Sequence, residues 1–144
     1  DVLQIEEADF KSLVETRVLL EIDGAGKAAE RRTTEDIMAM QKALTAYEVE
    51  VARNSVAVEE DLLFHLKIAE ASKNKVLQTL MLIITPDIIK SFVDLQVCKD
   101  DTLDKTLKGH QDILDCIVAQ NVEGAQSAMR LHLKDVIDIS LSNP

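Results

Sequence analysis

Apolar residues recur at intervals of three and four positions along most of this chain, which is the spacing of one face of an α-helix. With only four glycines and two prolines in 144 residues, few positions break this pattern. Short polar segments divide the chain into six predicted helices. The first three cover about residues 8–31, residues 33 or 34 up to a polar segment at 53–55, and residues 56–71. The last three cover residues 74 up to a polar segment at 99–102, residues 103–117 and residues 121–139. Short joints favour antiparallel neighbours, so the chain is predicted to be all-α, an antiparallel bundle of about six helices in a single domain over residues 1–144.

A few residues indicate where these helices start and bend. Asn74 and Asn121 stand where side-chain caps are expected, at the starts of the fourth and the sixth helix. Gly24 and Gly26 predict a kink or an interruption in the first helix. Pro86 predicts a kink in the fourth helix rather than its end.

Composition narrows the class of protein. Aromatic residues make up only 3% of the chain, so the core must be aliphatic and base stacking on aromatic side chains is not expected. The formal net charge of −10 disfavours direct contact with DNA. The two cysteines, Cys98 and Cys116, form no motif, which favours a reducing cytoplasm and, for Cys116, ordinary core packing. No apolar run reaches the roughly 18 residues of a membrane span, so no membrane partner is expected.

All three histidines of the chain fall on the apolar faces of predicted helices. Asp61 lies four residues before His65, so both side chains share one face. His110 and His132 lie ten or eleven residues on either side of a turn at 120–121, which places them at similar depth in two adjacent antiparallel helices. An unpaired buried imidazole costs roughly 1–3 kcal/mol. A divalent metal ion shared by all four side chains would satisfy them together.

The set of donor atoms limits the choice of metal, but it does not decide between a structural site and a ligand-binding site. Three imidazoles and one carboxylate suit Zn²⁺ first, and also Ni²⁺, Mn²⁺ or Fe²⁺. A closed tetrahedral site would be structural zinc, whereas five or six coordination would leave room for water or a small acid. Three unrelated core histidines, each with its own hydrogen-bond partner, are the alternative to a metal site.

Arg17 is a second candidate site residue. It lies between Leu13 and Leu20 on the apolar face of the first predicted helix, where a solvated arginine is not expected. Its planar guanidinium matches a carboxylate, so a buried Arg17 could bind an anionic effector. The alternative is an internal salt bridge to Glu15, Glu21 or another acid.

Three motifs carry a resemblance to a known family. They are residues 14–21 (VETRVLLE), residues 61–65 (DLLFH) followed by Ala71 and Asn74, and the spaced set His110, Ile113, Ile117, Asn121, Ala125, Met129, His132 and Leu133. Together they resemble the ligand-binding FCD domain of FadR-type GntR transcription regulators, over about residues 10–136. Two positions depart from the pattern, since the family often has an acid at Gly109 and usually aspartate at Asn121.

The resemblance implies a fold and a function. It implies an antiparallel bundle in which Asp61, His65, His110 and His132 coordinate a divalent metal, below a cavity for a small carboxylate effector. It implies a homodimer that binds DNA only through an N-terminal winged helix-turn-helix domain absent from this chain. The first hypothesis is therefore an effector-sensing domain and not an enzyme, with metal and Arg17 holding an organic or sugar acid.

Two other functions are weighed against this hypothesis. A metal-dependent hydrolase or transferase lacks a further histidine to act as general base, and the Glu-x-x-His pattern of di-iron bundles is missing. A structural zinc bundle that binds a protein partner differs from an effector-sensing domain in its response to small molecules. It would lose stability on metal removal, and no small molecule would restore it.

Overall fold

The computed structural model describes residues 10–54, 57–95 and 103–142, and these residues form six α-helices and no strand. The helices are α1 (Phe10–Arg31), α2 (Thr34–Asn54), α3 (Val58–Ala71), α4 (Lys75–Leu95), α5 (Leu103–Val118) and α6 (Val122–Ser142). The prediction of an all-α fold is confirmed. The predicted joint at 99–102, Cys98, and the start of the first helix before residue 10 lie outside the described residues.

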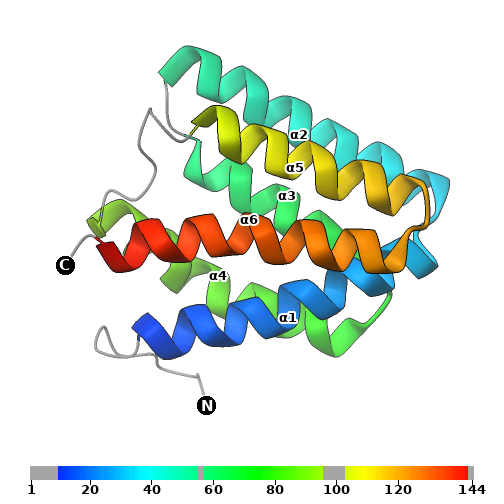
Figure 1. Cartoon of the computed structure of the whole chain (residues 1–144), viewed down its shortest axis with the longest axis horizontal. Helices are drawn as coiled ribbons and strands as arrows, with labels where there is room; N and C mark the ends of the chain where they lie inside the picture. Colours follow the sequence, from blue (N-terminus) through cyan, green and yellow to red (C-terminus); the bar gives the residue numbers. More distant parts are fainter. Residues whose placement is uncertain (1–9, 55–56, 96–102, 143–144) are drawn as a thin grey trace.

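Successive helices run in opposite directions, as Figure 1 shows, and together they form an antiparallel bundle. Helix α3 packs against α1, α2 and α4, while α5 and α6 pack against each other and against α1. Helix α2 covers α3 and α5. No helix among the described residues is long and apolar enough to cross a membrane. Because α3, α5 and α6 belong to one packed unit, side chains distant in sequence can meet between them.

Side-chain caps are present at the N-termini of three helices. At the start of α2 the Thr33 hydroxyl accepts from the backbone N–H of Asp36 (3.1 Å), and the Asp36 carboxylate accepts from the Thr33 N–H (2.9 Å). The Asn74 side chain accepts from the Leu77 N–H (3.1 Å) at α4. The Asn121 side chain accepts from the N–H of residue 124 (2.9 Å) at α6. The caps expected at Asn74 and Asn121 are therefore present.

The interruption expected in the first helix is wrong. Helix α1 runs unbroken past Gly24 and Gly26, and neither glycine has a positive φ. A methyl group at Gly26 would lie only 2.5 Å from the side-chain nitrogen of Gln126 on α6. The glycine therefore leaves room for the Gln126 side chain against α1, and packing of this kind outweighs the helix-breaking tendency of the sequence. Pro86 lies inside α4, which continues past it to Leu95.

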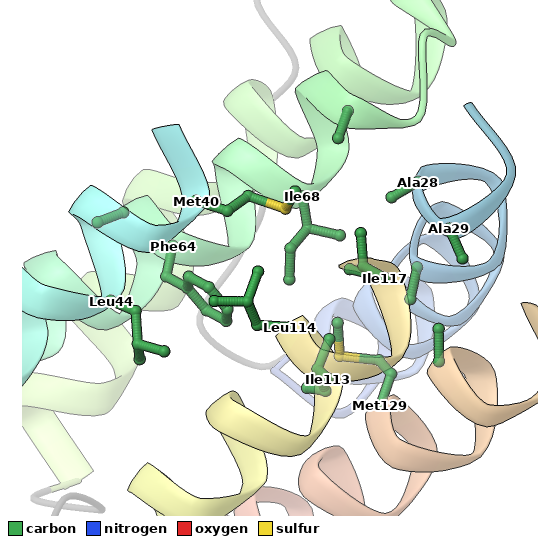
Figure 2. Packing of buried hydrophobic residues seen from close by; sticks show 14 of the residues in the cluster. Ala28, Ala29, Met40, Leu44, Phe64, Ile68, Ile113, Leu114, Ile117 and Met129 are labelled. Carbon is green, nitrogen blue, oxygen red and sulfur yellow. The ribbon is translucent and has the colours of Figure 1, made fainter. Parts of the chain in front are cut away.

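The core is mainly aliphatic, as the low aromatic content predicted. In Figure 2, Ala28 and Ala29 of α1 lie beside Ile117 of α5, and Phe64 lies between Leu44 and Leu114. A second cluster, made by α1, α3 and α4, includes Leu13, Leu62, Leu77, Met81 and Ile84. The two clusters flank α3 and hold its polar residues away from solvent.

Candidate metal centre

Four buried polar side chains from three helices meet inside the bundle. Asp61 and His65 come from α3, His110 from α5 and His132 from α6. One ligand atom from each lies within 4.8 Å of the ligand atoms of all the others. The ring centroids of His110 and His132 are 4.5 Å apart, and those of His65 and His132 are 5.2 Å apart. The structure thus brings together all four residues that the sequence singled out.

The contacts within this cluster are close without forming a complete hydrogen-bond network. Asp61 Oδ1 lies 2.8 Å from His110 Nε2 and 3.3 Å from His65 Nε2, and His65 Nε2 lies 3.2 Å from His132 Nε2. Nevertheless Asp61 Oδ1 and both ring nitrogens of His110 are buried with no hydrogen-bond partner in suitable geometry. Such orphaned buried groups are rare in folded proteins and require an explanation.

The distances within this cluster are compatible with a divalent cation bound by the four side chains. Bonds of about 2.1 Å to each ligand atom place neighbouring ligand atoms roughly 3.0–3.4 Å apart. Three observed separations, of 2.8, 3.2 and 3.3 Å, are close to that range, and all four ligand atoms lie within 4.8 Å of one another. The donor set also fits, because one carboxylate and three imidazoles suit zinc and its neighbours in the first transition series.

The electrostatics of the metal-free cluster favour two of the ligands in their metal-binding form. Burial alone would raise the pKa of Asp61, but the neighbouring imidazoles of His110 and His65 hold it well below its usual value, so the carboxylate is ionised. Burial, with the charges of His110 and His65, holds the pKa of His132 well below its ordinary value, so this ring is neutral.

His65 differs from His132 because a second carboxylate touches it. Burial alone would lower the pKa of His65, but the charge of Glu21 and the contact with Asp61 raise it to about 9. Glu21 Oε1 accepts a hydrogen bond from His65 Nδ1. At neutral pH the metal-free His65 therefore carries a proton on each nitrogen and must lose the Nε2 proton to bind a cation.

Arg17 is buried on the same face of α1 as Glu21, one turn away. Its Nε donates to Glu21 Oε2 over 2.5 Å. Burial would raise the pKa of Glu21, but Arg17 and His65 together lower it, so Glu21 is ionised between two donors. The internal salt bridge considered from the sequence exists, and its acid is Glu21. From the sequence, Glu21 was expected only as an ion-pair partner of Arg17, and its contact with His65 was not predicted.

A small cavity adjoins this part of the cluster. It is lined by α1, α3 and α4, including Glu21, Gly24, His65 and Met81, and it has no room for a water-sized molecule. Typical small-molecule sites enclose roughly 300–1,000 Å³. In this conformation the cavity is therefore smaller than a usual ligand pocket.

The family of the chain is shown by comparison with known proteins. Residues 12–135 match the FCD domain, and the chain belongs to that family. It is 31% identical over 141 residues to the HTH-type transcriptional regulator LutR of Bacillus subtilis, covering 95% of this chain and 64% of that protein. It is 34% identical over 130 residues to the Uxu operon transcriptional regulator of Escherichia coli, covering 86% of this chain and 51% of that one.

Other similar proteins agree with this assignment. A putative L-lactate dehydrogenase operon regulatory protein of Escherichia coli is 30% identical over 141 residues, with coverage of 93% and 53%. The solved structure of Streptococcus agalactiae GntR superposes with a TM-score of 0.77 at 26% identity, over 92% of this chain and 60% of that one. The structure of Escherichia coli McbR/YncC, at 16% identity, shares the fold with a TM-score of 0.83, over 98% of this chain and 72% of that one.

The names and the lengths of these relatives bear on the function class of the chain. They are named as transcriptional regulators, which agrees with the prediction that this chain is not an enzyme. The chain spans between about half and two thirds of the length of these curated relatives. It therefore aligns with only part of each of these longer proteins.

Proposed function

We propose that this chain is the effector-sensing domain of a GntR-type regulator, in which Asp61, His65, His110 and His132 hold a divalent cation that helps bind a small carboxylate. The observation that carries the proposal is the convergence of four buried ligand atoms within 4.8 Å of one another, with Asp61 Oδ1 and the His110 nitrogens lacking hydrogen-bond partners. Zinc suits this donor set best, and nickel, manganese or iron would also be accommodated.

The carboxylate nature of the effector is supported by three observations. A cation held by only four protein groups retains positions for oxygen ligands when it is five- or six-coordinate. The buried Arg17 charge acts on both His65 and His132, so a positive side chain lies near the proposed metal site. One relative is named as a regulator of an L-lactate dehydrogenase operon, and lactate is a small hydroxy acid. We therefore propose that Arg17 contacts the effector's carboxylate.

Because the cavity beside His65 has no room for a water-sized molecule, an effector must shift α1 or α4 to enter. This requirement fits a sensor, since a ligand changes a conformational equilibrium only when it binds one arrangement better than the other. A coupling free energy of about 1–3 kcal/mol is sufficient for regulation. The shift would reach DNA through a DNA-binding domain outside this chain, in a protein acting in the cytoplasm.

A homodimer would convert such a shift into a changed spacing between two DNA-binding domains. Helix α4 supports this part of the proposal, because Val76, Leu80 and Ile83 lie one turn apart and remain exposed in the single chain. Light scattering at micromolar concentration tests it. A mass of one chain, unchanged in Leu80→Glu, would contradict the dimer at this face.

The sensing proposal is tested by thermal shift and calorimetry with hydroxy acids and sugar acids, on zinc-loaded and metal-stripped protein. We expect at least one acid to stabilise the loaded protein, by about 2.7 kcal/mol at 100 times its dissociation constant, and none to stabilise the stripped protein. Asp61→Ala should abolish the effect. Glu59→Ala, on the exposed side of the same helix, is the matched control.

The small cavity also favours a second function, a closed structural zinc site. In that case metal removal lowers the melting temperature and no acid in the panel raises it further. An unresponsive loaded protein would therefore select the structural function over the sensor.

A further inference from the structure

We propose that Glu21 is a positioning residue for the metal, because it anchors His65 through Nδ1 and so directs Nε2 toward the other three ligands. This inference rests on the proposed metal site and deepens it. It assigns to Glu21 a function that the resemblance did not give to this position.

Both oxygens of Glu21 are engaged inside the bundle, where the residue is 3% exposed. Oε1 accepts from Nδ1 of His65, and Oε2 accepts from Nε of Arg17 over 2.5 Å. A carboxylate that holds the proton on Nδ1 leaves the lone pair of Nε2 for the cation. It also fixes the plane of the ring, and a carboxylate in this place makes the imidazole a stronger ligand.

His65 is anchored differently from His110. Nδ1 of His110 is buried and makes no hydrogen bond among the described residues, and its ring is held by edge contacts with Tyr47 and Phe64. Of these two imidazoles, only that of His65 has a charged partner at Nδ1 among the described residues. Loss of Glu21 should therefore affect metal binding more than the loss of a single packing contact.

Glu21 also offsets a repulsion. The Arg17 guanidinium is buried, and its positive charge acts on His65 and His132. Uncompensated, this charge would disfavour a divalent cation in the same low-dielectric interior. The Glu21 carboxylate, which is paired with Arg17, carries a negative charge that offsets this repulsion.

The competing explanation is that Glu21 serves only to pair with Arg17 and so to stabilise the fold. Two variants separate these roles. Arg17→Met removes the ion pair and retains the Glu21–His65 contact. Arg17→Met combined with Glu21→Met removes both, and replaces the buried pair by apolar side chains of similar volume, a change that folded proteins often tolerate.

The experiment measures the zinc dissociation constant of each protein by competition with a chromophoric chelator. We expect Arg17→Met to bind zinc as tightly as the wild type or more tightly, and the double variant to bind about 10–100-fold more weakly than Arg17→Met. Equal dissociation constants for these two variants would overturn the inference. Failure of the wild type itself to bind zinc would instead contradict the proposed metal site.

If the double variant does not fold, a second measurement tests whether Glu21 positions His65 for metal binding. In zinc-loaded wild-type protein, ¹⁵N spectra of the imidazole rings should show His65 protonated at Nδ1 and bound to metal at Nε2. The Nδ1 proton should exchange slowly with solvent, because Glu21 holds it in the core. A His65 bound to zinc through Nδ1 would overturn the inference, and a merely structural role for Glu21 would not produce the protected proton.

Discussion

Metal binding at neutral pH should release a proton from His65. In the metal-free protein, burial lowers the pKa of this imidazole, but Glu21 and Asp61 raise it to about 9. At pH 7.5 a group with this pKa is about 97% protonated, whereas one with the ordinary pKa of about 6.5 is roughly 10% protonated. Because a metal-bound nitrogen cannot keep its proton, His65 contributes close to one released proton per bound ion.

Calorimetry in buffers of different ionisation enthalpy measures this release directly. The slope of the observed binding enthalpy against the buffer's ionisation enthalpy gives the number of protons released. Glu21→Gln isolates the contribution of His65, because the variant lacks the charge that raises its pKa. We expect its slope at pH 7.5 to be smaller than that of the wild type by more than half a proton. Identical slopes would refute the argument that Glu21 controls the protonation of His65.

Further predictions concern single side chains. His132→Ala should weaken zinc binding by about 100-fold or more, measured by chelator competition, because it removes a ligand atom. Arg17→Met should leave zinc in place and weaken binding of the effector acid about ten-fold or more, measured by calorimetry. Ile113→Ala should cost about 2–5 kcal/mol in urea unfolding, since the side chain is fully buried, while Leu131→Ala, 63% exposed, should cost less than about 0.5 kcal/mol. Asn121→Ala should cost about 1 kcal/mol by the same measurement, because it removes the cap of α6.

Each of these outcomes has a counterpart that would count against the account. Zinc binding unchanged in His132→Ala would remove this residue from the ligand set. Loss of folding in Arg17→Met would assign Arg17 a structural role. Equal losses for Ile113→Ala and Leu131→Ala would contradict the placement of Ile113 in the core.

The protonation of His65 also makes the stability of the metal-free protein depend on pH. A pKa raised on folding contributes stability that is fully present below the unfolded value of about 6.5 and is lost as the pH rises through about 9. Chemical denaturation of metal-free protein between pH 6.5 and 9.5 should therefore show a declining free energy of unfolding. Glu21→Gln should show a smaller decline, and an equal decline in both proteins would contradict the assignment to His65.

The candidate site could be predicted from the sequence because its polar residues occupy positions on the apolar faces of helices, where polar side chains are not expected. Asp61 and His65 lie one turn apart on a buried face of α3, and periodicity alone shows this. His110 and His132 lie at matched distances from the turn between α5 and α6. A short turn makes two helices antiparallel neighbours. The number of residues between each histidine and the turn therefore predicted that His110 and His132 lie at the same depth.

Glu21 was not recognised as part of the site for a physical reason. The predicted buried face of α1 followed Leu13, Arg17 and Leu20, but in the structure Glu21 is buried and Leu20 is only partly so. The spacing of four residues from Leu13 to Arg17 to Glu21 was the available signal. A glutamate is rarely buried unless it is paired, and its second partner, His65, is 44 residues away and visible only after folding.

The uninterrupted course of α1 could not be predicted for a related reason. The helix propensity of Gly24 and Gly26 is a local property, whereas the packing of the Gln126 side chain against α1 is a tertiary one. Tertiary packing decides such cases, because the buried face of a helix supplies most of its stability.

The central claim is that one cation is bound by Asp61, His65, His110 and His132 between α3, α5 and α6. Anomalous diffraction at the zinc absorption edge, from crystals grown with zinc, tests it most directly. We expect a single strong peak about 2.0–2.2 Å from one atom of each of these four side chains. A peak elsewhere, or imidazoles turned apart with no ion between them, would contradict the account.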